Sequence, residues 1–156
     1  IMINVYEAEC KIESWVYNDG GRSNYFRGEK AGDCVTRAVA IVSGMDYKRV
    51  YDTFAKLERA RGNPRSARNG VRTQTKAFKD QMRTWGFTWV PTMFIGSGCQ
   101  VHLRADELPQ GRLVCMLSKH ASAVIGGVIN DTYDPSRGGK RAVYGYWIYT
   151  NEINEK

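Results

Sequence analysis

The sequence has few of the residues that build metal centres and disulfide frameworks. It holds two histidines and four cysteines in 156 residues. No two cysteines have the CxxC spacing of a zinc site, and their wide separation does not fit a dense disulfide framework either. We therefore expect a protein of a reducing compartment, with no metal and no other cofactor.

Long apolar runs are also missing. No segment approaches the roughly 20 apolar residues of a membrane-spanning helix, and the start of the chain has neither the basic nor the apolar region of a signal peptide. This pattern favours a cytoplasmic protein without membrane contacts. The length fits one domain, residues 1–156, with a single hydrophobic core.

Acidic residues are outnumbered by basic ones. The 23 Lys and Arg against 16 Asp and Glu give a net charge of +7, which attracts anionic partners without naming one. The basic residues concentrate at positions 48–79 and 136–141, but the chain has no zinc-finger or RNP-type motif. A solvated helix face with a basic loop is therefore favoured, and a nucleic-acid groove is the less favoured alternative.

The first half of the chain has the pattern of turns followed by helices. Residues 16–33 are rich in Gly, Asn, Asp and Ser, which indicates turns that lead to Cys34. Apolar residues then recur at helical spacing in three stretches. The predicted helices occupy residues 34–43, the segment from Asp46 to the RGNP stop at 61–64, and part of 69–86.

The second half is rich in short runs of β-forming residues. These runs lie at residues 87–90, 112–118, 121–125, 127–133 and 141–150. Gly126 and Gly127 would join the third and fourth runs in a hairpin. Helices first and strands second predict an α+β fold, in which N-terminal helices pack on a C-terminal antiparallel sheet.

Cys34 lies at the start of the first predicted helix, in the segment GDCVTRAVAI. Unpaired backbone N–H groups and the positive end of the helix dipole stabilise a thiolate there, and the same groups can hold an oxyanion. Cys34 is therefore a candidate nucleophile, although it could also pack as a small hydrophobe. Cys10, Cys99 and Cys115 are interpreted as such packing residues.

A nucleophilic cysteine needs a base, and the chain offers two histidines. His102 has no evident carboxylate partner, so we interpret it as a surface or structural residue. His120 opens a strand, and a hairpin about residues 126–127 places Asp131 diagonal to it on one face, where a carboxylate would orient the imidazole. A one-residue change of register would give that role to Asp134. The simpler alternative is a strand-end histidine followed by turn-forming aspartates.

This order of Cys on a helix, His on a strand and Asp on the next strand resembles the papain-like cysteine peptidase superfamily. GDCVTRAVAI is similar to the nucleophile segment of OTU-type deubiquitinases, and HASAVIGGVINDTYDP resembles the strand pair of bacteriocin-processing and transglutaminase-like enzymes. Residues 16–149 resemble a family of small uncharacterised phage and bacterial proteins. The resemblance implies a papain-like fold with Cys34 as nucleophile and His120 as base, and a bacterial host cell as location if the protein is phage-encoded.

The sequence departs from the papain-like pattern at the oxyanion hole. Papain-like enzymes carry a glutamine several residues before the cysteine, and no glutamine precedes Cys34 here. Asn24, the backbone around Asp33, or Gln74 would have to replace it. Arg22, in the segment NDGGR, could bind a substrate carboxylate or phosphate, or simply belong to a turn.

These residues predict a thiol-dependent hydrolase. It would act on an amide, isopeptide or thioester bond of a protein or peptide, such as a host protein, through an acyl-enzyme intermediate on Cys34. Two alternatives stay open. One is a transglutaminase or deamidase that uses the same thioester, and the other is a non-catalytic or weakly catalytic module that binds a host protein or nucleic acid through its basic surface.

Overall fold

The computed structural model describes residues 14–27, 32–62 and 70–150. The interpretation of Cys10 and the expected helix stop at residues 63–64 lie outside these residues. The helical elements are η1 (Arg22–Asn24), α2 (Cys34–Ser43), α3 (Tyr47–Ala60) and α4 (Lys76–Thr84). The strands are β1 (Trp15–Tyr17), β2 (Phe87–Pro91), β3 (Met93–Phe94), β4 (Gly98–Cys99), β5 (Arg112–Leu117), β6 (His120–Ile125), β7 (Val128–Asp131) and β8 (Gly145–Tyr149). The α+β class predicted from the sequence is confirmed.

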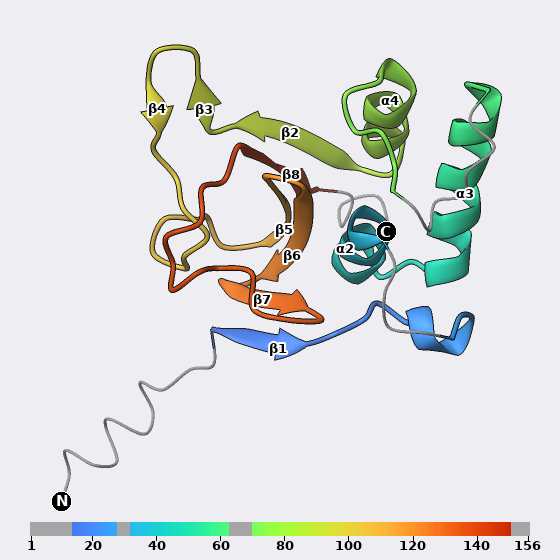
Figure 1. The fold of residues 1–156 in the computed structure, drawn as a ribbon, viewed down its shortest axis with the longest axis horizontal. Helices are drawn as coiled ribbons and strands as arrows, with labels where there is room; N and C mark the ends of the chain where they lie inside the picture. Colours follow the sequence, from blue (N-terminus) through green and yellow to red (C-terminus); the bar gives the residue numbers. More distant parts are fainter. Residues whose placement is uncertain (1–13, 28–31, 63–69, 151–156) are drawn as a thin grey trace, which may run out of the picture.

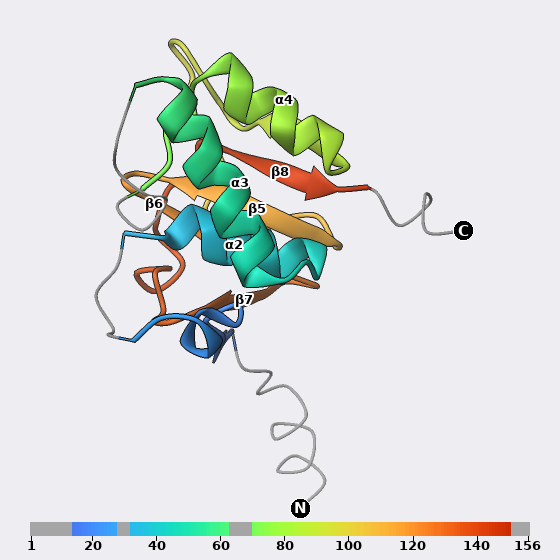
Figure 2. The ribbon, with the colours of Figure 1, turned by 90° about the vertical axis from the view of Figure 1, so that its right-hand side faces the viewer.

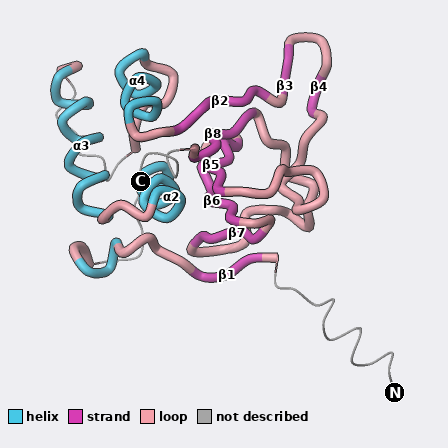
Figure 3. The backbone as a smooth tube through the Cα atoms, turned by 180° about the vertical axis from the view of Figure 1, so that it is seen from behind, coloured by secondary structure: helices cyan, strands magenta, loops and turns pink. Residues whose placement is uncertain are grey.

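The main sheet has six strands in the order β1-β7-β6-β5-β8-β2. Every neighbouring pair is antiparallel except β1 and β7, which run parallel. The expectation of a wholly antiparallel sheet, and of turns throughout residues 16–33, is therefore wrong at this edge. A three-residue strand is too short to show a period of two, so only its pairing with β7 reveals it. β3 and β4 form a separate hairpin that extends away from the helices (Figure 3).

The three α-helices lie on one side of the main sheet, with α2 between the sheet and α3 (Figures 1 and 2). The sheet carries apolar side chains on both faces. The helix side holds a core that includes Val39, Phe54, Phe78, Val114 and Trp147. The far side holds a second core that includes Leu103, Leu113, Val124, Ile129 and Val143. Alternate residues of the central strands β5 and β6 supply both cores.

The helix boundaries follow local signals. α2 ends as predicted, because Gly44 takes the left-handed conformation with φ 75°. Asp46 stands at the N-cap of α3, but its side chain accepts a hydrogen bond from the Tyr25 hydroxyl instead of capping the helix. α4 begins at Lys76 because Thr75 Oγ1 accepts the Phe78 N–H at 3.1 Å. Among the described helices, none is long and apolar enough to cross a membrane.

Candidate active site

Cys34 is the first residue of α2, the position that the sequence predicts. Asp33 occupies the N-cap, yet its side chain makes no capping bond to the first turn. Backbone N–H groups at the start of a helix have no intrahelical partner, so this turn presents donors beside the Cys34 thiol. Helix α2 packs against β6, and this packing brings the Cys34 thiol to the strand that carries His120.

The β6–β7 hairpin turns at residues 126–127, as predicted. Its register pairs Ile125 with Val128 and continues to Ala123 with Asn130. Because side chains alternate along a strand, this register brings Asp131 to His120, and His120 Nε2 lies 2.7 Å from Asp131 Oδ2. The expected contact between these two residues is confirmed.

The His120 imidazole, which contacts Asp131, also interacts with the Cys34 thiol. Burial raises the pKa of the Cys34 thiol, but its hydrogen bond with His120, the imidazole charge and the Ala121 N–H outweigh burial and leave the pKa below its ordinary value. Burial lowers the pKa of His120, but Asp131 and Cys34 together raise it to about 9. Both pKa shifts act in the direction of a thiolate that faces an imidazolium. With Nε2 on Asp131, the ring nitrogen left for the thiol is Nδ1.

Three further groups hold the Asp131 carboxylate. Ser122 Oγ donates to Asp131 Oδ2 at 2.7 Å, and the Thr132 N–H donates to Oδ1 at 2.7 Å. Arg37 Nη2, from one turn into α2, lies 3.6 Å from Oδ1. Burial raises the pKa of Asp131, but the hydrogen bonds from His120 and Ser122 lower it by more, so the carboxylate stays charged. Sequence reasoning missed Ser122 and Arg37 as partners, although Ser122 stands opposite Asp131 in the predicted register.

Asp33 lies behind the site, enclosed by partners. It is 1% exposed and pairs with Arg37, with the Tyr47 hydroxyl at 2.6 Å and with Arg22 Nε at 3.2 Å. Burial and the neighbouring carboxylate raise the pKa of Tyr47. The Asp33 side chain therefore joins η1, α2 and α3 and is not free to face a substrate. Arg22, proposed as an anion binder, holds the carboxylate of the protein's own Asp33.

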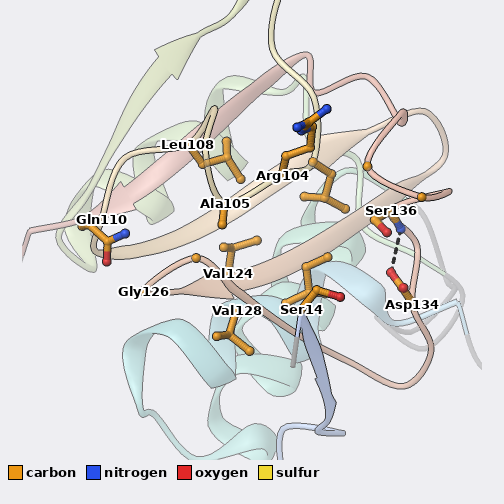
Figure 4. A pocket seen from close by; sticks show the side chains of 15 residues that line it. Ser14, Arg104, Ala105, Leu108, Gln110, Val124, Gly126, Val128, Asp134 and Ser136 are labelled. Atoms are coloured by element: carbon orange, nitrogen blue, oxygen red, sulfur yellow. Dashed lines mark hydrogen bonds between the residues drawn. The ribbon is translucent and has the colours of Figure 1, made fainter. Parts of the chain in front are cut away.

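The reserve acid Asp134 does not reach His120. Its Oδ1 accepts the Ser136 N–H at 3.0 Å, which fixes the turn after β7. Figure 4 shows this pair at the rim of a pocket of about 630 Å³. The pocket lies over the far-side core and is lined by residues such as Leu108, Val124 and Val128. Neither Cys34 nor His120 lines it, so it is separate from the thiol site.

The remaining oxyanion candidates lie in different surroundings. Asn24 is exposed at the end of η1. Gln74 lines a pocket of about 280 Å³ with the side chains of Thr73, Lys79, Trp89, Met116, Leu117, Tyr144 and Trp147. This pocket adjoins the thiol site, because Met116 pairs with Ala121 and Leu117 pairs with His120 across the sheet. An oxyanion role for Gln74 stays a prediction.

The interpretation of Cys99 as a packing residue is wrong, whereas the interpretation of His102 as a surface or structural residue stays a prediction. His102 has a carboxylate partner, because its Nδ1 lies 3.0 Å from Glu107 Oε1. Cys99 is exposed instead of packed, since it ends a two-residue strand outside the main sheet. Cys115 does pack as a small hydrophobe, and burial raises the pKa of its thiol to about 12. Within the described residues, no group of three or more His, Cys, Asp and Glu side chains could hold a metal ion.

The fold and the site together define a mixed α+β protein with a Cys–His–Asp relay, by which we mean the neighbouring side chains of Cys34, His120 and Asp131, between α2 and the main sheet. No protein-family model matches the chain, and no curated protein or solved structure matches it either.

Proposed function

We propose that the protein is a thiol-dependent acyl hydrolase or transferase of papain-like type, with Cys34 as nucleophile, His120 as general base and acid, and Asp131 as the orienting acid. The observation that carries the proposal is the His120–Asp131 hydrogen bond next to Cys34, whose thiol pKa the same imidazole lowers. The lowered pKa of the thiol and the raised pKa of the imidazole have the directions that this chemistry needs.

In the first half-reaction, the Cys34 thiolate attacks the carbonyl carbon of an amide, isopeptide or thioester. The negative charge that develops on the carbonyl oxygen is held by backbone N–H groups at the start of α2. The tetrahedral intermediate then collapses, and the leaving group takes a proton from the His120 imidazolium. The product of this step is a thioester on Cys34.

In the second half-reaction, His120 removes a proton from water, which attacks the thioester and releases the acid. An amine in place of water would give transfer, and a glutamine side chain as the acyl donor would give deamidation or cross-linking. Throughout, Asp131 keeps the imidazole in one orientation and stabilises its charged form. Hydrolysis, transfer and deamidation therefore need the same three residues and differ in the acyl donor or in the nucleophile that ends the cycle.

The pocket of about 280 Å³ beside Leu117 is the proposed binding place for the acyl donor. Its lining combines the aromatic residues Trp89, Tyr144 and Trp147 and the apolar Met116 and Leu117 with the polar Thr73, Gln74 and Lys79, a composition suited to one bulky apolar side chain beside a polar backbone. Gly145 leaves room for Trp89 in this lining, because a Cβ atom at position 145 would lie 2.4 Å from the indole ring.

A binding module is the second candidate function. A polar pocket of about 650 Å³ is lined by Arg22, Arg27 and Arg37 together with Asp19 and Thr132. Arg22 and Arg37 also pair with Asp33, but three guanidinium groups against one acidic lining residue still favour an anionic partner, such as an acidic protein segment or a nucleic-acid phosphate. In this alternative the relay would stabilise the fold without turning over a substrate.

The two functions are separated by incubating wild type and Cys34→Ala with a bacterial lysate, followed by mass spectrometry. We expect new protein termini, or deamidated or cross-linked glutamines, that form with wild type and are missing with Cys34→Ala. Equal product patterns for the two proteins would contradict the enzyme and favour the binding module.

A further inference from the structure

A second cysteine–histidine–carboxylate relay lies outside the site described above. Cys99 Sγ is 3.5 Å from His102 Nε2, and His102 Nδ1 is 3.0 Å from Glu107 Oε1. The cysteine is exposed, whereas the Cys34 relay is largely buried. None of these three side chains lines the pockets described above.

Several contacts fix the relay in place. His102 forms a β-bridge with Ala142, so its backbone is tied to the segment before β8. The Glu107 carboxylate accepts the backbone N–H of His102 at 3.2 Å and lies 3.4 Å from Arg104 Nε. The imidazole is therefore oriented from behind by a carboxylate that is itself anchored, and its other nitrogen faces the thiol.

The setting of this relay suits a small reagent better than a polymeric substrate. Cys99 ends β4 in the hairpin that extends away from the helices (Figure 1), so it has no helix N-terminus to hold an oxyanion. A thiol that is open to solvent and next to a positioned base meets the requirements for exchange with a dissolved disulfide, which needs access and a thiolate but no binding pocket.

We propose that Cys99 is a modification site for low-molecular-weight disulfides, with His102 as its base and Glu107 as the positioning residue. His102 takes the thiol proton, and the Cys99 thiolate attacks one sulfur of the disulfide. The new S–S bond forms as the old one breaks, and the departing thiolate carries away the electron pair and is protonated in water. Cys99 is oxidised to a mixed disulfide that keeps one half of the reagent, and the other half of the reagent is reduced and leaves as a thiol.

The test measures the rate at which oxidised glutathione modifies the full-length chain, with each cysteine followed separately by peptide mass spectrometry. We expect Cys99 to be modified and buried Cys115 to stay free. His102→Ala should slow modification of Cys99 by roughly tenfold, less than the contribution of a base in an enclosed site because this pair is open to water. Glu107→Gln should slow it less than His102→Ala does, because the base itself is still present and only the carboxylate that stabilises its charged form is lost.

Two controls separate the relay from mere exposure. Asp106→Asn changes a neighbouring carboxylate that pairs with Arg104 but not with His102, and it should leave the rate unchanged. A synthetic peptide of residues 96–101, which contains Cys99 without His102, should react as slowly as His102→Ala. Equal rates for wild type, a folded His102→Ala and this peptide would overturn the proposal.

Discussion

His120 Nε2 and Ser122 Oγ lie at the same distance, 2.7 Å, from the same oxygen of Asp131. Both donors come from β6, two residues apart, and the acceptor comes from β7. The imidazole is therefore oriented by the neighbouring strand, while the thiol that it faces belongs to a helix. Any substitution that disturbs the Asp131 carboxylate should therefore alter the reactivity of Cys34, although Cys34 itself is unchanged.

The first prediction concerns the identity of the acid. Asp131→Asn should lower turnover by roughly two orders of magnitude or more, because an amide neither fixes the imidazole tautomer nor stabilises its charge. Asp134→Asn should leave turnover intact and cost less than about 1 kcal/mol of stability, because the amide oxygen can still accept the Ser136 N–H. Both variants are measured by thermal unfolding and by turnover of a substrate from the lysate experiment. A silent Asp131→Asn would contradict the assignment.

The second prediction concerns the pH dependence of Cys34 alkylation by iodoacetamide. Because the pKa of the thiol is lowered, the rate should reach its plateau below the pH range of an ordinary thiol. His120→Ala removes the main group that lowers this pKa and leaves burial, which raises it, so the midpoint should move upward. The rates must be resolved by residue, because Cys99 is also exposed. An unchanged midpoint in His120→Ala would show that the imidazole does not act on the thiol.

The third prediction concerns the buried charge of Asp33. Asp33→Asn leaves Arg22 and Arg37 without their shared carboxylate, so it should cost about 3 kcal/mol of unfolding free energy. The matched control is Asp46→Asn, whose exposed side chain accepts from Tyr25, and we expect it to cost at most about 1 kcal/mol. Urea unfolding measures both variants. If the two losses were equal, the ion-pair cluster would contribute nothing beyond a surface contact.

The fourth prediction concerns the aromatic pocket beside the thiol site. Peptide electrophiles that carry a Phe side chain next to the reactive group should label Cys34 faster than matched Glu or Ala probes. Trp89→Ala should reduce the preference for Phe roughly tenfold, which corresponds to a loss of ~1.4 kcal/mol of aromatic contact. Each labelling rate is divided by the iodoacetamide rate of the same variant, so that a change in thiol reactivity does not count as a change in preference.

Phe94→Ala is the control for this experiment, because Phe94 is an exposed aromatic residue that does not line the pocket. It should leave the preference intact. Fast labelling by iodoacetamide without any preference among the peptide probes would remove the pocket from the substrate site while leaving the thiol chemistry in place.

The sequence by itself determined the elements whose signals are local. The apolar spacing of residues 34–43 and the left-handed Gly44 define α2, and the glycine turn with alternating residues on either side defines the β6–β7 register. Since a period of two leaves no freedom once the turn is fixed, the meeting of His120 with Asp131 could be predicted.

Only the tertiary structure decided the contacts between segments whose sequences do not indicate that they lie together. β1 is too short for a pattern and becomes a strand only against β7. Arg37 lies four residues after Asp33, a helical spacing that the sequence shows, but Arg22 and Tyr47 reach Asp33 only because η1 and α3 converge on the start of α2. Cys99 and His102 lie near each other in the chain, but the loop that returns Glu107 to the imidazole depends on the bridge from His102 to Ala142. Charged and polar side chains pair over any sequence separation, whereas periodicity records only what one element buries, so these contacts had to be seen in three dimensions.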